Sequence, residues 1–135
     1  VTVGSDYYSR RRIAPPSLAK LVSTKLYAQR QSPFYVEPVI AGITSDGDPY
    51  LWSSDGLGAP MTSESFVVAG SCSASLAGIC EALYKDGMGP DELCDVAARC
   101  LLAAMARDCL SGVDAVVHVI TRAGLTTRVL KCPSD

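Results

Sequence analysis

The order of the hydrophobic patterns along the 135 residues constrains the fold more than any single motif does. A helical pattern comes first, a run of strand patterns follows, and two helical patterns precede two final strands. Strands in separate runs with a helix pair between them indicate an α+β fold, in which helices cover the outer faces of sheets. No repeat, linker or low-complexity tract interrupts the order, so we expect one domain over residues 1–135.

The first helix is expected to begin near Pro15 and Pro16, with Ser17 as its N-cap. Ser32 and Pro33 are expected to end it, because the residue before a proline is driven away from helical geometry. Four apolar residues recur at helical spacing and predict its buried face: Leu18, Leu21, Val22 and Leu26.

Three strands are expected next, over residues 36–44, 50–54 and 66–69. Residues 45–48 read Ser-Asp-Gly-Asp, which is typical of a hairpin turn between the first two strands. A second turn is expected at residues 55–58, Asp-Gly-Leu-Gly.

Two helices and two strands complete the pattern. Gly70 and Ser71 lead into the first helix, and residues 87–90 break it. Asp91 and Glu92 open the second helix, where the helix dipole stabilises acidic side chains. The strand at residues 115–121 is apolar at nearly every position, so we expect it to be central and covered on both faces. A last strand is expected over residues 125–131.

Composition excludes several classes of protein. Apolar residues make up 48% of the chain and charged residues 19%, which is typical of a folded domain. The net charge is −2, and the one dense basic run is the arginine triplet at residues 10–12, so we expect no nucleic-acid partner. No apolar stretch approaches the roughly 20 residues that span a bilayer, and no secretory signal is visible, so we expect no membrane association. The chain opens in mid-pattern without an initiator Met, and we expect an upstream segment to be missing.

The six cysteines form no CxxC pair and no loop-rich disulfide framework. Cys72 and Cys80 share a helix-face spacing, and at eight residues apart along a helix they are separated by about 12 Å, beyond the reach of a disulfide. We therefore expect reduced, mostly buried cysteines in an intracellular protein. With His118 as the only histidine, a zinc site is not expected, and neither is any other cofactor.

Five segments, in this order, resemble the beta-type subunits of the 20S proteasome. Residues 34–42 (FYVEPVIAG) resemble a strand entry typical of the third position of the beta ring, and residues 54–60 (SDGLGAP) resemble the turn after the hairpin. Residues 66–72 (FVVAGSC) and 107–112 (RDCLSG) resemble two further family elements. The strand pair at residues 117–131 is similar to the end of third-position subunits.

The resemblance implies a four-layer αββα sandwich, the N-terminal-nucleophile hydrolase fold, with the chain as its C-terminal two-thirds. It implies a place in a hetero-oligomer of 28 alpha and beta subunits, in the cytoplasm and nucleus, that degrades proteins, including ubiquitin-marked ones. The third-position subunits are non-catalytic, so the expected role is structural and the chain itself is not expected to be an enzyme.

Active members of the family use an N-terminal threonine as nucleophile. Thr2 is not the first residue, and no lysine precedes Lys20 to tune it, so neither nucleophile nor base is expected here. Ser71, Asp108 and Ser111 match the rest of the family's hydrogen-bond network. We interpret them as architecture, because an aspartate before Ser-Gly can accept turn N–H groups and fix a helix-to-strand corner.

Asp55 has two open interpretations. By the resemblance, it faces the neighbouring trypsin-like subunit and helps to line a pocket for basic side chains. Alternatively, Asp-Gly is a common turn dipeptide and Asp55 only shapes a bend.

Three alternative functions remain open for this chain. One is an active threonine-type endopeptidase subunit, and another is a stand-alone N-terminal-nucleophile hydrolase. The third is a Ser-His-Asp hydrolase using Ser71 and His118. That triad is disfavoured because the second glycine of a Gly-x-Ser-x-Gly elbow is absent and because His118 is expected to be a half-buried strand residue.

Overall fold

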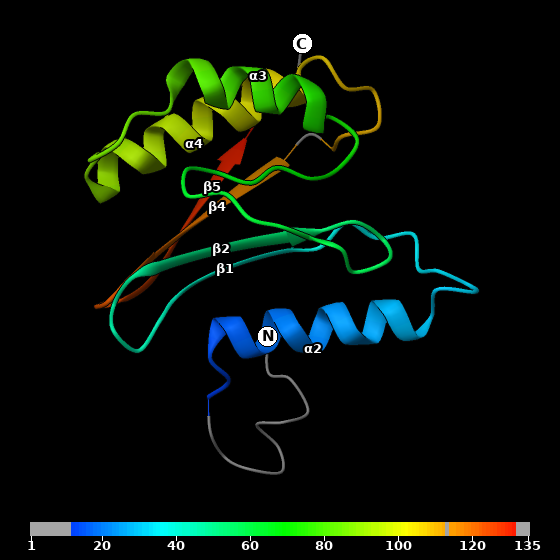
Figure 1. Ribbon diagram of the computed structural model, residues 1–135. Coiled ribbons are helices and arrows are strands. Elements are labelled where there is room, and N and C mark those ends of the chain that lie inside the picture. Colours follow the sequence, from blue (N-terminus) through cyan, green and yellow to red (C-terminus); the bar gives the residue numbers. More distant parts are fainter. Residues whose placement is uncertain (1–11, 113, 132–135) are drawn as a thin grey trace. The chain divides into compact units, whose positions relative to one another are not determined.

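The computed structural model describes residues 12–112 and 114–131. The chain divides between Ser63 and Glu64 into two units, each of which is described separately. The first unit contains α2 (Pro15–Ala28), β1 (Val39–Ile43), β2 (Pro49–Ser54) and β3 (Pro60–Met61). The second contains α3 (Ser73–Leu83), α4 (Pro90–Met105), β4 (Asp114–Thr121) and β5 (Gly124–Lys131) (Figure 1). The expected helix–strand–helix–strand order is confirmed.

Helix α2 begins at Pro15, as the sequence indicated, but it ends earlier than expected. Its N-cap is Ala14, and no side chain caps it, so the prediction of Ser17 as the N-cap was wrong. Two prolines fill its first positions, where the backbone N–H has no partner within a helix and proline costs nothing. The helix ends at Ala28 rather than Ser32, because the next two backbone N–H groups bond three residues back, in a tighter turn.

The buried side of α2 is centred on Ala19 and Leu26, whereas Leu21 is 45% exposed and was wrongly placed on that face. The helix packs on β1 and β2. Pro15 lies so close to β1 that a Cβ added at Gly42 would stand 2.8 Å from its ring. The absence of a side chain at Gly42 therefore allows helix and sheet to approach closely at Pro15.

The first unit's sheet is antiparallel in the order β1-β2-β3. The hairpin register runs from Val39 opposite Ser53 to Ile43 opposite Pro49, and Gly47, with φ of +91°, turns the chain between the strands. This confirms the predicted hairpin, although its first strand starts at residue 39 rather than 36.

The two faces of this sheet differ. Gly42 faces α2, and strand alternation places Ile40 and Trp52 on the same side, where Trp52 is only 4% exposed. The opposite face carries Val39 and Ala41, both exposed. This sheet therefore has one helix-covered face and a second face on which Val39 and Ala41 are exposed, while Ser53, opposite Val39, is buried.

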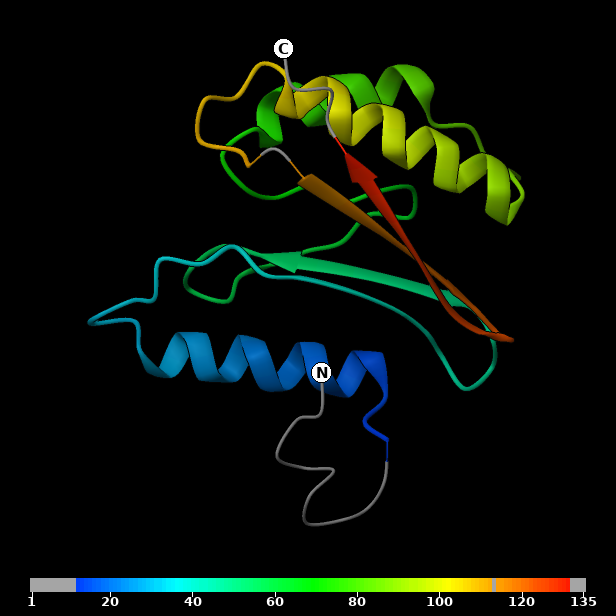
Figure 2. The same cartoon turned by 180° about the vertical axis from the view of Figure 1, so that it is seen from behind.

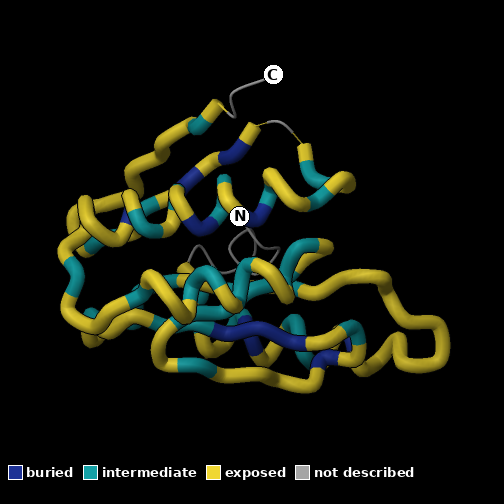
Figure 3. The backbone as a smooth tube through the Cα atoms, turned by 90° about the horizontal axis from the view of Figure 1, so that it is seen from above, coloured by how far each residue is buried: buried dark blue, intermediate teal, exposed yellow. Residues whose placement is uncertain are grey.

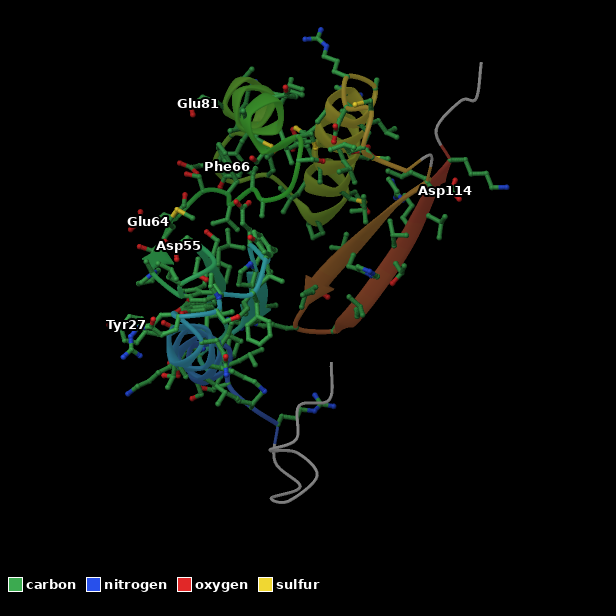
Figure 4. The ribbon with its side chains drawn as sticks, turned by 90° about the vertical axis from the view of Figure 1, so that its right-hand side faces the viewer. Tyr27, Asp55, Glu64, Phe66, Glu81 and Asp114 are labelled. Atoms are coloured by element: carbon green, nitrogen blue, oxygen red, sulfur yellow. The ribbon has the colours of Figure 1, made fainter. Side chains whose placement is uncertain are left out.

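The third predicted strand, at residues 66–69, was wrong. The third strand is β3, which pairs with β2 just after the turn. Residues 66–69 join no strand in the described part of the chain. Instead, the ring of Phe66, labelled in Figure 4, packs edge-on against Tyr84, which caps α3, with 6.1 Å between the ring centroids. All four residues of this run are half-buried, and Phe66 is covered in part by an aromatic contact rather than by strand pairing.

In the second unit, α3 packs on α4, and α4 packs on β4 (Figure 2). Both helices were predicted, as were the glycine break before Pro90 and the acidic first turn of α4. Gly87 has φ of +80°, a left-handed conformation that glycine adopts without cost.

Strands β4 and β5 form an antiparallel hairpin. Ala115 and Val117 are buried, whereas Val116 and Ile120 on the other face are 46% and 45% exposed. The prediction of a central strand covered on both faces was therefore wrong for the described residues, in which β4 pairs with β5 alone. Exposed positions predominate along β5, and Figure 3 shows how small a share of the trace is fully buried. On the open face of the hairpin, four exposed apolar residues lie on either side of the polar pair His118 and Thr127: Val116, Ile120, Leu125 and Val129.

Candidate functional site

Ser71, Asp108 and Ser111, which the sequence singled out as a set, lie together in the second unit. We call them the serine–aspartate cluster. Oδ2 of Asp108 accepts the Ser71 hydroxyl and, at 2.7 Å, the Ser111 hydroxyl. Oδ1 accepts the backbone N–H of Leu110 at 3.2 Å. The expected bond from the turn to the carboxylate is therefore present.

Local structure places each member of the cluster. The backbone turns sharply after α4, because the N–H groups of Arg107 and Asp108 donate to carbonyls three residues back. Ser71 follows Gly70, whose φ of +104° lets the chain bend before α3. The cluster thus ties the start of α3 to the turn that follows α4.

The hydrogen bonds of the cluster favour the ionised form of the Asp108 carboxyl. They lower the pKa of Asp108, with Ser71 the largest cause, followed by Ser111 and the Leu110 N–H, while burial acts weakly in the opposite direction. A carboxylate that stays ionised and already accepts three donors is a poor general base near neutral pH. The arrangement is suited to holding a corner in place.

His118 does not complete a triad in the observed arrangement. It is an exposed residue of β4, not the half-buried one expected, and its Nδ1 lies 2.9 Å from Oγ1 of Thr127 across the hairpin. The ring is therefore engaged in a cross-strand pair, while the hydroxyls of Ser71 and Ser111 donate to Asp108.

Asp55 lies in the first unit, at the start of the turn after β2 (Figure 4). Its Oδ1 accepts the backbone N–H of Leu57 at 2.9 Å and of Ala59 at 3.0 Å. Its own carbonyl accepts the N–H of Gly58 at 3.1 Å. Asp55 therefore shapes the bend, and both backbone bonds to its side chain use the same oxygen.

The same turn is fastened to α2 by a contact that no sequence pattern indicated. The Ser23 hydroxyl donates to the Gly58 carbonyl at 2.6 Å, across 35 residues of sequence. Gly58 has φ of +83°, and a Cβ added there would stand 2.5 Å from the Ser23 carbonyl oxygen. Glycine is required at this position for two independent reasons, conformation and space.

In the part of the chain that the structure describes, no group of three or more His, Cys, Asp or Glu side chains is placed to hold a metal ion. None of the described helices is both long and apolar enough to cross a membrane. The five described cysteines are free thiols: Cys94 and Cys100 are buried, Cys72 and Cys80 are intermediate, and Cys109 is exposed.

Comparison with known proteins identifies the class to which this fold and cluster belong. Residues 5–120 match the proteasome subunit family, and the chain belongs to that family. Within it, the chain is 45% identical over 126 residues to proteasome subunit beta type-3 of Trypanosoma brucei brucei and 40% identical over 125 residues to that of Picea mariana. It is 36% identical over 129 residues to the probable proteasome subunit beta type-3 of Schizosaccharomyces pombe.

These alignments cover 93%, 93% and 96% of the present chain, in the same order. They cover 62%, 61% and 63% of the relatives, so the chain spans about three-fifths of the length of the curated relatives that it matches. The family resemblance drawn from the sequence motifs is confirmed.

Proposed function

We propose that the protein is a non-catalytic, structural beta-type subunit at the third position of the beta ring of a 20S proteasome core particle. Its partners would be the other alpha and beta subunits of a 28-subunit hetero-oligomer. In that particle it would keep its neighbours in register during protein degradation, including that of ubiquitin-marked proteins. The similarity over 93% of the chain to subunits named beta type-3 supports this assignment.

The fold that we propose is the four-layer αββα sandwich of the family, formed as a single domain. Each unit supplies a sheet with helices on one face, which corresponds to half of such a sandwich. Each sheet also has a face with exposed apolar residues, Val39 and Ala41 in β1 and Val116 and Ile120 in β4. Apolar sheet faces of this kind are buried against another sheet in sandwiches, at a spacing of about 10 Å.

The observation that carries the non-catalytic assignment is the similarity to subunits named beta type-3, and the hydrogen bonds to Asp108 support an architectural role for the serine–aspartate cluster. The Asp108 carboxylate accepts three hydrogen bonds, and its pKa is lowered, so it remains a charged anchor rather than a proton acceptor. Ser71 and Ser111 direct their protons to that carboxylate. The cluster then holds the corner between α4 and β4 in an inactive subunit.

Asp55 would contribute to function outside its own subunit. Its two backbone bonds both go to Oδ1, so the carboxylate can shape its turn and still present negative charge to a neighbour. We propose that this charge lines a trypsin-like pocket on the adjacent subunit, where it favours basic side chains. The expected location of the assembled particle is the cytoplasm and nucleus.

A threonine-directed covalent inhibitor tests the non-catalytic role. The native particle that contains this protein is treated with a peptide epoxyketone, and each chain is then examined by mass spectrometry. We expect the active subunits of the same particle to be labelled, which makes them an internal positive control, and this chain to stay unlabelled. A label on Thr2, or on any other threonine of this chain, would contradict the proposal.

A further inference from the structure

A small cavity lies in the second unit, between the start of α4 and the hairpin of β4 and β5. Its volume is about 110 Å³, well above the roughly 10–15 Å³ that one water molecule requires, so it admits a molecule of several non-hydrogen atoms. Residues of all three elements line it: Pro90, Asp91 and Cys94 of α4, Val119 of β4, and Thr126 and Arg128 of β5. None of them belongs to the serine–aspartate cluster or to the Asp55 turn.

The cavity has an apolar inner wall and a polar rim. Cys94 is only 4% exposed and Val119 is half-buried, whereas Asp91, Thr126 and Arg128 are exposed. Val119 and Thr126 are register partners in the hairpin, so the inner wall and the rim meet at this pair. A ligand that fits must therefore combine a short apolar part with polar groups.

The rim carries charges of opposite sign on different elements. Asp91 lies in the first turn of α4, and Arg128 lies on β5. Nη1 of Arg128 donates to Oδ1 of Asp95 at 2.9 Å, so the guanidinium is held by Asp95 rather than by Asp91. A guanidinium has five N–H donors, and one bond to Asp95 leaves others for a ligand.

A ligand with a single charge fits this rim poorly. An anion on Arg128 would be repelled by the Asp91 carboxylate, and a cation on Asp91 would be repelled by the Arg128 guanidinium. A zwitterion carries both charges on one small skeleton and can place each beside its opposite. The smallest common molecules of this kind are α-amino acids with short side chains.

We propose that the cavity binds a small free α-amino acid, such as L-alanine, in its zwitterionic form. The ligand carboxylate accepts from the guanidinium of Arg128, and the ligand ammonium group donates to the carboxylate of Asp91. The methyl group packs toward Val119 on the inner wall. The Thr126 hydroxyl can donate or accept and is a further partner at the rim.

The test uses the native particle from which the protein is isolated, with Cys94 as the reporter. Iodoacetamide alkylates accessible thiols, and L-alanine in the cavity should shield Cys94 from it. After digestion with trypsin, mass spectrometry separates Cys94, in the peptide 86–99, from Cys109, in the peptide 108–122. Cys109 is exposed and does not line the cavity, so it is the internal control for the reagent.

We expect L-alanine to slow the alkylation of Cys94 and to leave that of Cys109 unchanged. The rate at Cys94 should fall in proportion to 1 + [L]/Kd, which reaches about tenfold at a ligand concentration of about nine times Kd. Propionate and ethylammonium each keep a similar skeleton but only one of the two charges. Both should protect Cys94 much less than L-alanine does.

Single substitutions test the two charges separately. Asp91→Asn and Arg128→Gln should each raise the L-alanine concentration for half protection by about two- to fivefold, the range expected for exposed charge pairs. Glu92→Gln is the matched control, because it removes a carboxylate from the same helical turn that does not line the cavity. It should leave the protection unchanged.

Three outcomes would overturn the proposal. If Cys94 is not alkylated even without L-alanine, the cavity is closed to small solutes. If L-alanine leaves the rate at Cys94 unchanged, or slows Cys94 and Cys109 alike, it does not bind at this site. If propionate or ethylammonium protects as well as L-alanine, the cavity does not recognise a zwitterion. The wild-type experiment decides the matter even if a variant fails to assemble.

Discussion

Two substitutions at Asp55 separate its role in the turn from its proposed role in the neighbouring pocket. Asp55→Asn removes the charge but keeps the side-chain oxygen that accepts from Leu57 and Ala59. Asp55→Ala removes the charge and both bonds. The two interpretations of this residue therefore predict different results for the same pair of variants.

The loss of two hydrogen bonds at an exposed turn costs about 1 kcal/mol in total, because water replaces much of what is lost. Native-state hydrogen exchange at the amides of Leu57 and Ala59 measures this cost directly. In Asp55→Ala we expect exchange to become roughly fivefold faster, since a tenfold change corresponds to about 1.4 kcal/mol. In Asp55→Asn we expect exchange close to that of the wild type.

Peptide cleavage by the intact particle measures the effect of the charge. A single charge at the rim of a pocket contributes about 1 kcal/mol or less, so cleavage after basic residues should fall by up to about fivefold in both variants. Cleavage after apolar residues should not change and is the internal control. If Asp55→Asn assembles normally and cleaves after basic residues at the wild-type rate, the pocket role is refuted and Asp55 is a turn residue.

The remaining predictions concern the turn and the cluster. Gly58→Ala should destabilise the protein by at least about 1 kcal/mol more than Gly87→Ala. Both positions have nearly the same positive φ, but only Gly58 abuts the Ser23 carbonyl. Equal shifts of the thermal unfolding temperature in the two variants would show that the contact with Ser23 is unimportant. The pKa of Asp108 is lowered on folding, so the stabilisation by its carboxylate is complete above about pH 4 and is lost as the pH falls through the folded-state value. The difference in unfolding temperature between wild type and Asp108→Asn should accordingly be constant near neutral pH and shrink in acid; a difference that persists unchanged in acid would show that charge is not the basis of the cluster.

Most of the secondary structure could be predicted, because it rests on local signals. The hairpin between β1 and β2 follows from Ser-Asp-Gly-Asp between two apolar runs, and the start of α4 follows from Pro90 and two acidic residues. The strand predicted at residues 66–69 failed because strand formation depends on a partner. The sequence shows the apolar run but not the contact between Phe66 and Tyr84 that buries part of it.

Of the site, the residues of the serine–aspartate cluster could be predicted, but the contact that fastens the Asp55 turn to α2 could not. The family motifs indicated Ser71, Asp108 and Ser111 as a set, and the structure brings them into one hydrogen-bonded cluster. The contact of Ser23 with Gly58 had no local signal, because it depends on how α2 packs on the sheet. Long-range pairs of this kind follow from tertiary packing, which periodicity within one segment does not encode.

The size and composition of the native assembly test the central claim most directly. The protein is isolated under native conditions through an affinity tag, its particle mass is measured, and every chain in the particle is identified by mass spectrometry. A structural beta-ring subunit predicts one very large particle made of many different chains of the proteasome family, with this protein as a fixed component. Recovery of the protein as a monomer or a small oligomer, with no other proteasome subunits, would contradict the account.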